Sequence, residues 1–136
     1  MATRSLIGKV NSDGTITDIY CHYDGYPQHN GVVLQEHYAS PIKVDQLLAL
    51  GNLSVLGEEI GEQQDFNNRS TQNEKWCLAY GRDRRESNQQ AITHTRDQFF
   101  NTGHGVDYLY LYNNNEWECY SAWTLKPENI PALKAA

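Results

Sequence analysis

Residues 19–27 are I-Y-C-H-Y-D-G-Y-P, and the expected fold is built outward from this stretch, which we call the box. In a strand, side chains alternate between the two faces. The more apolar face, which should meet the core, carries Ile19, Cys21 and Tyr23. The opposite face carries a phenol, an imidazole and a carboxylate, from Tyr20, His22 and Asp24. The strand should end at Asp24 and Gly25, which tolerate turns, while Pro27 keeps Tyr26 extended.

The polar face of the box has two interpretations. In the first, Asp24 orients His22 as a general base, with Tyr20 and Tyr26 beside it. The structural alternative is ordinary hydrogen bonding and packing at a strand end. His22 and Asp24 are therefore candidate catalytic residues. The candidate binding residues add tyrosines and arginines of the box and of residues 80–85, namely Tyr20, His22, Asp24, Tyr26, Tyr80, Arg82, Arg84 and Arg85.

The segments around the box predict a hairpin and a helix. Strands are expected at residues 5–10 and 15–23, joined by the turn N-S-D-G at 11–14. After the box, Asn30 should cap a helix over residues 32–38. His37 lies on the apolar side of that helix, which favours a packed histidine over a metal ligand.

A second helix should begin at Ser40-Pro41, a cap followed by proline at the first helical position, and end at Gly51. Its apolar face carries Ile42, Val44, Leu47 and Leu48. Residues 52–56 are expected to be an apolar loop. Residues 57–75 form a long polar connection with acidic side chains, Glu58, Glu59, Glu62 and Asp65. Such a loop is solvated and mobile by default, or else part of a binding surface.

A third strand is expected at residues 75–80, followed by the basic cluster G-R-D-R-R at 81–85. This cluster could pair with the acidic connection, hold an anionic partner, or be solvated, since exposed ion pairs contribute little. The spacing of apolar residues predicts a third helix over 88–101, which Gly103 and Gly105 should end.

A second hairpin is expected from strands at 108–112 and 116–120, with the turn N-N-N at 113–115. In Y-L-Y-L-Y the tyrosines share one face, which suits a half-covered sheet or an interface. Residues 124–136 should be an irregular tail. These elements predict one α+β domain over 1–136, with a single antiparallel sheet of about five strands and about three helices on one face.

The composition and net charge of the chain disfavour several classes of function. The chain has 136 residues and a net charge of -6. The negative charge disfavours direct binding to nucleic acid, which needs a basic surface. We expect no secretion signal, and no apolar run approaches the roughly 20 residues of a membrane span. The three cysteines are far apart and lack metal-site spacing, so we expect reduced thiols, no metal and no cofactor.

Five segments of the chain are Y-C-H-Y-D-G-Y-P at 20–27, E-H-Y at 36–38, L-L-A-L-G-N-L-S-V-L-G at 47–57, A-Y-G-R-D-R at 79–84 and the Y-L-Y-L-Y strand. Together they resemble a family of small uncharacterised proteins encoded by bacteriophages and prophages. The resemblance follows chain order over most of the length, although Tyr23 stands where tryptophan is more typical. It implies a phage accessory protein in the host bacterial cytoplasm, and it implies no activity.

Three functions remain open. The first is a small phage-encoded binding protein that inhibits or modulates a host protein, such as a defence nuclease in the manner of an anti-CRISPR protein; tyrosine and arginine often anchor such interfaces. The second is a small enzyme or nucleotide-binding protein that uses His22 and Asp24, although no phosphate loop or nucleophile elbow is present. The third is a phage structural or assembly protein that forms a homo-oligomer.

Overall fold

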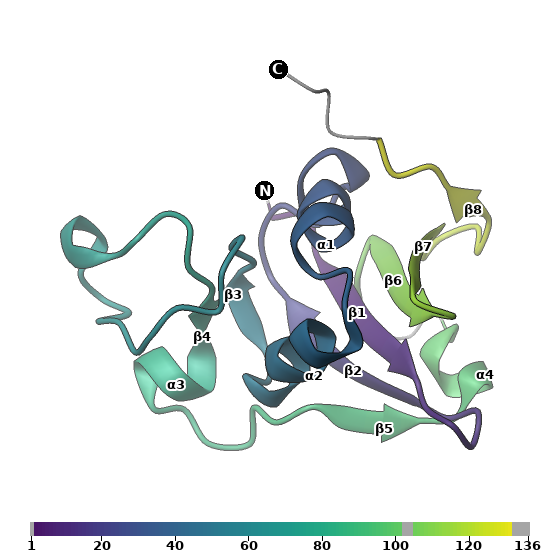
Figure 1. The fold of residues 1–136 in the computed structure, drawn as a ribbon, viewed down its shortest axis with the longest axis horizontal. Coiled ribbons are helices and arrows are strands. Elements are labelled where there is room, and N and C mark those ends of the chain that lie inside the picture. Colours follow the sequence, from purple (N-terminus) through teal and green to yellow (C-terminus); the bar gives the residue numbers. More distant parts are fainter. Residues whose placement is uncertain (1, 102–104, 132–136) are drawn as a thin grey trace.

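One mixed sheet organises the protein in this computed structural model, which describes residues 2–101 and 105–131 (Figure 1). Its eight described strands are β1 (Ser5–Val10), β2 (Ile16–Cys21), β3 (Leu53–Val55), β4 (Leu78–Ala79), β5 (Ile92–His94), β6 (Tyr108–Asn113), β7 (Glu116–Ser121) and β8 (Pro127–Glu128). The strand order is β4-β3-β2-β1-β6-β7-β8, and β5 also pairs with β2. The helical segments in the described ranges are the π-helical turn η1 (Pro27–Gly31), α1 (Val32–His37), α2 (Pro41–Ala49), the 3-10 turn η2 (Arg69–Thr71), α3 (Tyr80–Arg84) and α4 (Arg96–Phe99).

Both expected hairpins form. In the β1–β2 turn, the backbone N–H of Asn11 donates to the carbonyl of Thr15 at 2.7 Å. In the β6–β7 turn, Asn114 and Asn115 have φ values of 53° and 63°, a left-handed conformation that asparagine tolerates. The local turn chemistry therefore sets these two antiparallel pairs.

The expected antiparallel sheet of about five strands is wrong. β1 pairs with β6 in parallel, with Ile7 opposite Tyr110, and β2 pairs with β3 in parallel. Parallel neighbours need a long crossover, and here residues 22–52 join β2 to β3 while residues 11–107 separate β1 from β6. The short strands β3, β5 and β8 extend the sheet beyond the expected elements. Pairing between such distant segments has no local sequence signal.

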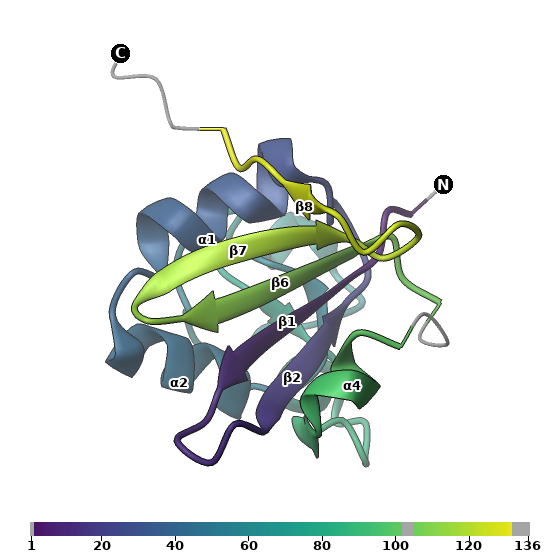
Figure 2. The ribbon, with the colours of Figure 1, turned by 90° about the vertical axis from the view of Figure 1, so that its right-hand side faces the viewer.

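Helices cover both faces of the sheet instead of one (Figure 2). α1 and α2 pack on one face, where Leu34 joins Tyr110 in the larger core cluster. α4 packs on the opposite face, where Phe99 joins Leu109 in a second cluster. Gly8 of β1 lies beneath α4, because a Cβ there would approach the Phe99 ring to 3.0 Å. Both sides of Y-L-Y-L-Y are therefore core.

The two helices after the box lie where expected but differ in detail. Asn30 does not cap α1; it is fully buried in η1, and its Nδ2 donates to the carbonyl of Tyr23 at 3.3 Å. Ser40 does cap α2, because its hydroxyl accepts from the backbone N–H of Lys43 at 3.3 Å. Ile42, expected to face the core, is 71% exposed. Across the described ranges, no helix combines the length and apolar character of a membrane span.

The middle of the chain departs further from expectation. Residues 53–55 of the expected loop form β3, the expected strand at 75–80 shrinks to β4, and the basic cluster forms α3. The expected helix over 88–101 is wrong, because β5 pairs with β2 and only the short α4 follows, capped by Thr95. Tertiary pairing has outweighed helical spacing here. Of the expected helix breakers, Gly103 lies outside the described residues.

The tyrosine face of β6 meets helices and offers no interface. Tyr110 and Tyr112 are 0% and 4% exposed. The hydroxyl of Tyr110 donates to the carbonyl of Gly25 at 2.6 Å, and that of Tyr112 donates to the carbonyl of Ala39 at 2.6 Å. The Tyr110 hydroxyl thus ties the sheet directly to the box. In the C-terminal tail, which was expected to be irregular, β8 pairs with β7.

The outer edge of β2 forks. Its first half pairs with β5 and its last residue, Cys21, pairs with β3. Between them, the side-chain Oδ1 of Asn52 accepts from the backbone N–H of Tyr20 at 2.9 Å. The backbone N–H of Asn52 in turn donates to the carbonyl of Gln89 at 2.7 Å. The side chain of Asn52 therefore takes the place of a neighbouring strand at Tyr20, where the box begins.

Candidate functional site

Past the end of β2, residues 22–26 of the box expose the rings of Tyr23 and Tyr26, and we call this segment the ridge. The hydroxyl of Tyr20 and Nδ1 of His22 lie 2.7 Å apart in a hydrogen bond, and the Tyr23 ring meets His22 edge-on with centroids 4.6 Å apart. Burial raises the pKa of Tyr20, so its hydroxyl stays protonated at neutral pH. His22 is therefore oriented by Tyr20, and not by Asp24 as their spacing suggested.

Asp24 turns the chain and carries a carboxylate at the ridge. Its φ is 58°, a conformation that aspartate tolerates. Its Oδ1 accepts a long hydrogen bond of 3.4 Å from the hydroxyl of Tyr26. Tyr23 and Tyr26 are 46% and 37% exposed. Tyr23 was expected to face the core, but strand alternation stops with β2 at Cys21, which frees the ring.

A groove lies between the ridge and the polar connection 57–75. It consists of two adjoining hollows of about 460 and 320 Å³, which share Asp24, Val55, Arg69, Gln72 and Leu78. The first hollow is also lined by Tyr23, Ser54 and Phe66, and the second by Gln64, Asn73, Glu74 and Trp76. We call this feature the Asp24 groove. Its lining combines an apolar floor from the sheet with aromatic and charged walls.

Internal hydrogen bonds hold the outer wall of the groove in place. The backbone N–H of Gln64 donates to Oδ1 of Asp83 at 2.7 Å, and the Gln64 side chain donates to the carbonyl of Cys77 at 3.2 Å. The side chain of Gln72 donates to two carbonyls of the same connection at 2.9 and 3.1 Å. The connection, by default a mobile loop in our expectation, is therefore fastened to β4 and α3.

Arg82 and Asp83 act as the anchor of this wall. Asp83 has a fully buried side chain, and its Oδ2 accepts from the backbone N–H of Ala79 at 2.8 Å. Arg82 pairs with it at 3.0 Å and donates to the carbonyls of Ile60 at 2.8 Å and Cys77 at 2.7 Å. These internal partners occupy the guanidinium that was a candidate for binding a ligand.

The other basic candidates lie on the outside of the wall. The guanidinium of Arg84 stacks over Phe66 and Tyr80, 4.6 and 4.7 Å from the ring centroids, and also pairs with Glu86. Arg85 is exposed at the end of α3. Burial raises the pKa of Tyr80, which keeps it neutral. Tyr80 and Arg84 thus pack against Phe66, a residue of the groove wall.

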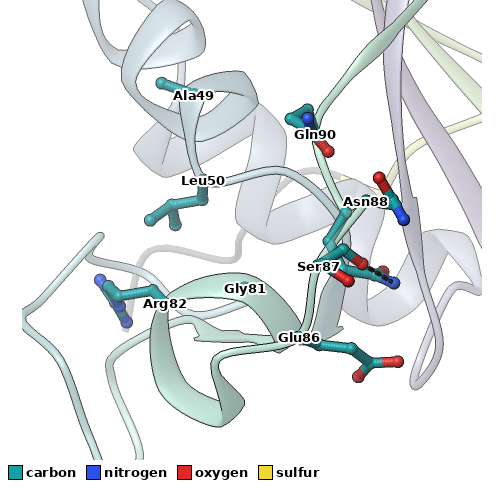
Figure 3. A pocket seen from close by; sticks show the side chains of 9 residues that line it. Ala49, Leu50, Gly81, Arg82, Glu86, Ser87, Asn88 and Gln90 are labelled. Carbon is teal, nitrogen blue, oxygen red and sulfur yellow. Dashed lines mark hydrogen bonds between the residues drawn. The ribbon is translucent and has the colours of Figure 1, made fainter.

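A further hollow of about 640 Å³ lies on the other side of α3 (Figure 3). It is lined by Ala49, Leu50, Gly81, Arg82 and residues 86–90. Figure 3 shows the Arg82 side chain turned away from Ser87 and Gln90. Both charged residues that line this hollow have partners in the protein: the Arg82 guanidinium is held by internal carbonyls, and the Glu86 carboxylate pairs with Arg84.

Two kinds of chemistry, metal binding and thiol catalysis, find no support among the described residues. Within residues 2–101 and 105–131, no three histidine, cysteine or acidic side chains gather as a metal site requires. The cysteines are buried, and burial raises the pKa of Cys21 and Cys119 to about 12. These thiols therefore stay protonated at neutral pH, the state in which cysteine is least reactive.

Of the residues that line the groove, the candidate set contained only Asp24, and three of those it missed are instructive. Tyr23 was assigned to the core because the expected strand was too long. Phe66 is the one aromatic residue in the connection 57–75, and that isolation is a signal that could have identified it. Arg69 is likewise the one cation among residues 57–74. A lone aromatic or a lone cation in a polar loop is a useful marker of a binding wall.

A scan against protein-family models, a search of curated proteins and a search of solved structures each returned no match to this chain. The resemblance to phage-encoded proteins therefore remains a prediction from the sequence, and the functional argument rests on the geometry of the ridge and groove.

Proposed function

We propose that the protein is a small phage-encoded binding protein that inhibits or modulates a host protein in the host bacterial cytoplasm. One observation carries the proposal: Tyr23, which lines the Asp24 groove, and Tyr26, which bonds to Asp24, both expose their rings. Tyrosine offers a rigid apolar ring with a polar tip, and such residues often dominate the free energy of protein association.

The arrangement of the polar groups favours binding over catalysis. A general base must lie within hydrogen-bond reach of its substrate and be positioned by a partner. His22 takes its hydrogen bond from Tyr20, Asp24 takes one from Tyr26, and Arg82 is held by Ile60 and Cys77. The enzyme and nucleotide-binding hypothesis needs Asp24 to orient His22 and Arg82 to hold the substrate, and both residues have other partners, so we do not propose it.

The proposal is tested by capturing host proteins with the purified, tagged chain from a bacterial lysate. The wild type should retain a specific host protein, and the double variant Tyr23→Ser, Tyr26→Ser should lose it. Ile42→Ser is the matched control, since Ile42 is 71% exposed but lies on α2. If the double variant retains the same proteins as the wild type, the ridge is not the binding surface and the proposal fails.

The inhibitory part of the proposal needs a separate measurement. The captured protein is purified and its own activity is assayed with increasing amounts of wild type and double variant; a defence nuclease would be followed by cleavage of its nucleic-acid substrate. Dose-dependent change with the wild type alone is the expected outcome. Tyrosine-dependent capture without any change in activity would reduce the function to binding.

A further inference from the structure

The outer wall of the Asp24 groove carries most of the excess negative charge of the chain. Residues 57–74 contain five carboxylates, Glu58, Glu59, Glu62, Asp65 and Glu74, and one guanidinium, Arg69. Of these five carboxylates, Glu74 lines the groove, and the inner wall adds Asp24. Two carboxylates at one hollow raise the local concentration of oppositely charged groups. A partner that enters this groove is therefore selected for positive charge.

The charged groups inside the groove are available for a partner. Within the part of the chain that the structure describes, Glu74 and Arg69 form no ion pair and their side-chain charges accept or donate no hydrogen bond. Asp24 receives the single long bond from Tyr26. By contrast, the amides of Gln64 and Gln72 are used to hold the wall. Two unneutralised carboxylates against one guanidinium leave the groove acidic.

The groove combines apolar and charged lining residues, a pattern that an extended chain can match. Its two hollows adjoin along Val55 and Leu78, which supply an apolar floor beneath the charged walls. An extended segment alternates its side chains between two directions. Apolar residues can then point to the floor at Val55 and Leu78, while cationic residues reach Asp24 and Glu74.

We propose that the Asp24 groove binds an extended basic segment of the partner protein, with alternating apolar and cationic side chains. This inference rests on the proposed binding function and names the chemistry of the partner. Arg69 would lower the affinity for such a segment, because it places a like charge in the same groove. The proposal therefore predicts whether removing the charge of Asp24, Glu74 or Arg69 raises or lowers the affinity for the segment.

The test uses two blocked nine-residue peptides that alternate leucine with either arginine or glutamate, and measures their dissociation constants by fluorescence anisotropy. The arginine peptide should bind more tightly than the glutamate peptide. Asp24→Asn and Glu74→Gln should each weaken its binding about two- to fivefold, as expected for partly exposed charge pairs, and Arg69→Gln should strengthen it by a similar factor. Added salt should weaken binding by screening.

The variants are chosen to leave the fold intact. Asparagine accepts the left-handed φ of 58° at position 24 as readily as aspartate does. Glu36→Gln and Glu116→Gln are matched controls, because each removes one exposed carboxylate from a residue that does not line the groove. These controls should change the dissociation constant by less than the groove variants do.

Several results would overturn the inference: equal or tighter binding of the glutamate peptide, no binding of the arginine peptide, or groove variants that behave like the controls. The proposed function fails separately. If the host protein is still captured through Tyr23 and Tyr26 but equally well by Asp24→Asn and Glu74→Gln, only the groove inference is wrong. If capture does not depend on the tyrosines, the proposed function itself is wrong.

Discussion

The tyrosines of β6 and the tyrosines of the box belong to two regions that use the same side chain in opposite ways. Tyr110 is fully buried and donates its hydroxyl to the carbonyl of Gly25, inside the box. Tyr23 and Tyr26 are among the exposed large side chains of the described residues. The Tyr110 hydroxyl therefore holds the box in place, whereas the rings of Tyr23 and Tyr26 are exposed to solvent.

The difference shows that residue type alone does not mark a recognition surface. In the sequence, Y-L-Y-L-Y and the box look equally suited to an interface. What separates them is the cover over each: α1 and α2 lie over one set, whereas the chain turns at Asp24 and leaves the other set uncovered. The buried set also supports the exposed one, because the Tyr110 hydroxyl holds the box through the carbonyl of Gly25.

The largest expected effect comes from removing the anchor of the groove wall. Asp83→Ala takes away the acceptor for two backbone N–H groups and the partner of Arg82. Breaking a buried ion pair in this way should cost about 3–5 kcal/mol in the free energy of unfolding. Urea denaturation measures the loss, and Glu62→Ala, on the exposed connection, is the control.

Hydrogen exchange sharpens that prediction. Asp83→Ala should raise amide exchange in residues 57–84 much more than in β1 and β6, because the wall is fastened through Asp83 and the central strands are not. A uniform increase in exchange over the whole chain would mean that residues 57–84 and the central strands unfold as one unit, which would contradict the prediction.

A smaller effect is expected at Tyr110. Tyr110→Phe keeps the packed ring but leaves the carbonyl of Gly25 buried without its donor, which should cost about 1–3 kcal/mol. Tyr23→Phe is the matched control and should change the free energy of unfolding by less than about 0.5 kcal/mol. If Tyr110→Phe and Tyr23→Phe lower the free energy of unfolding equally in denaturant titrations, the distinction between buried supporting tyrosines and exposed tyrosines is contradicted.

Alkaline pH should destabilise the core region. The pKa of Cys21 and Cys119 is raised by burial to about 12 from a model-thiol value of 9.0, so the folded chain keeps protons that the unfolded chain releases. Unfolding then releases protons, and stability is full below about pH 9 and falls as the pH rises toward 12. Cys119→Ala should flatten this fall in thermal melts, and an unchanged slope would exclude that thiol as a cause.

The smallest change in stability is expected at the ridge itself. Tyr23→Ala removes a ring that is 46% exposed, so the free energy of unfolding should change by about 0.5 kcal/mol or less. Partner capture should nevertheless be lost. A strongly destabilised Tyr23→Ala variant, seen in the same melts, would place Tyr23 with the supporting tyrosines.

Much of the local structure could be predicted from the sequence, because it depends on short-range chemistry. The turn N-S-D-G and the cap Ser40-Pro41 act within a few residues, and both lie as expected. The parallel pairing of β1 with β6 and the strand β5 depend on segments far apart in the chain, which no local pattern encodes. Those were the errors in the expected fold.

The candidate site was predictable in part for a similar reason. The box itself stands out by composition, and its exposed turn at Asp24 followed from the residue types. The groove could not be foreseen, because its outer wall comes from a connection some forty residues later that is fastened by Gln64 and Asp83. Arg82 was misleading for the same reason: its partners are backbone carbonyls, which every residue has.

The sheet is bordered by very short strands, and this limits how copies of the protein can meet. β4 and β8 are two residues long and β5 is three residues long. Longer open borders act as templates on which strands from other molecules add, the first step toward fibrils. Here too few free backbone groups line up for that. Stacking of copies through main-chain contacts is therefore disfavoured, and any contact between copies has to be made by side chains.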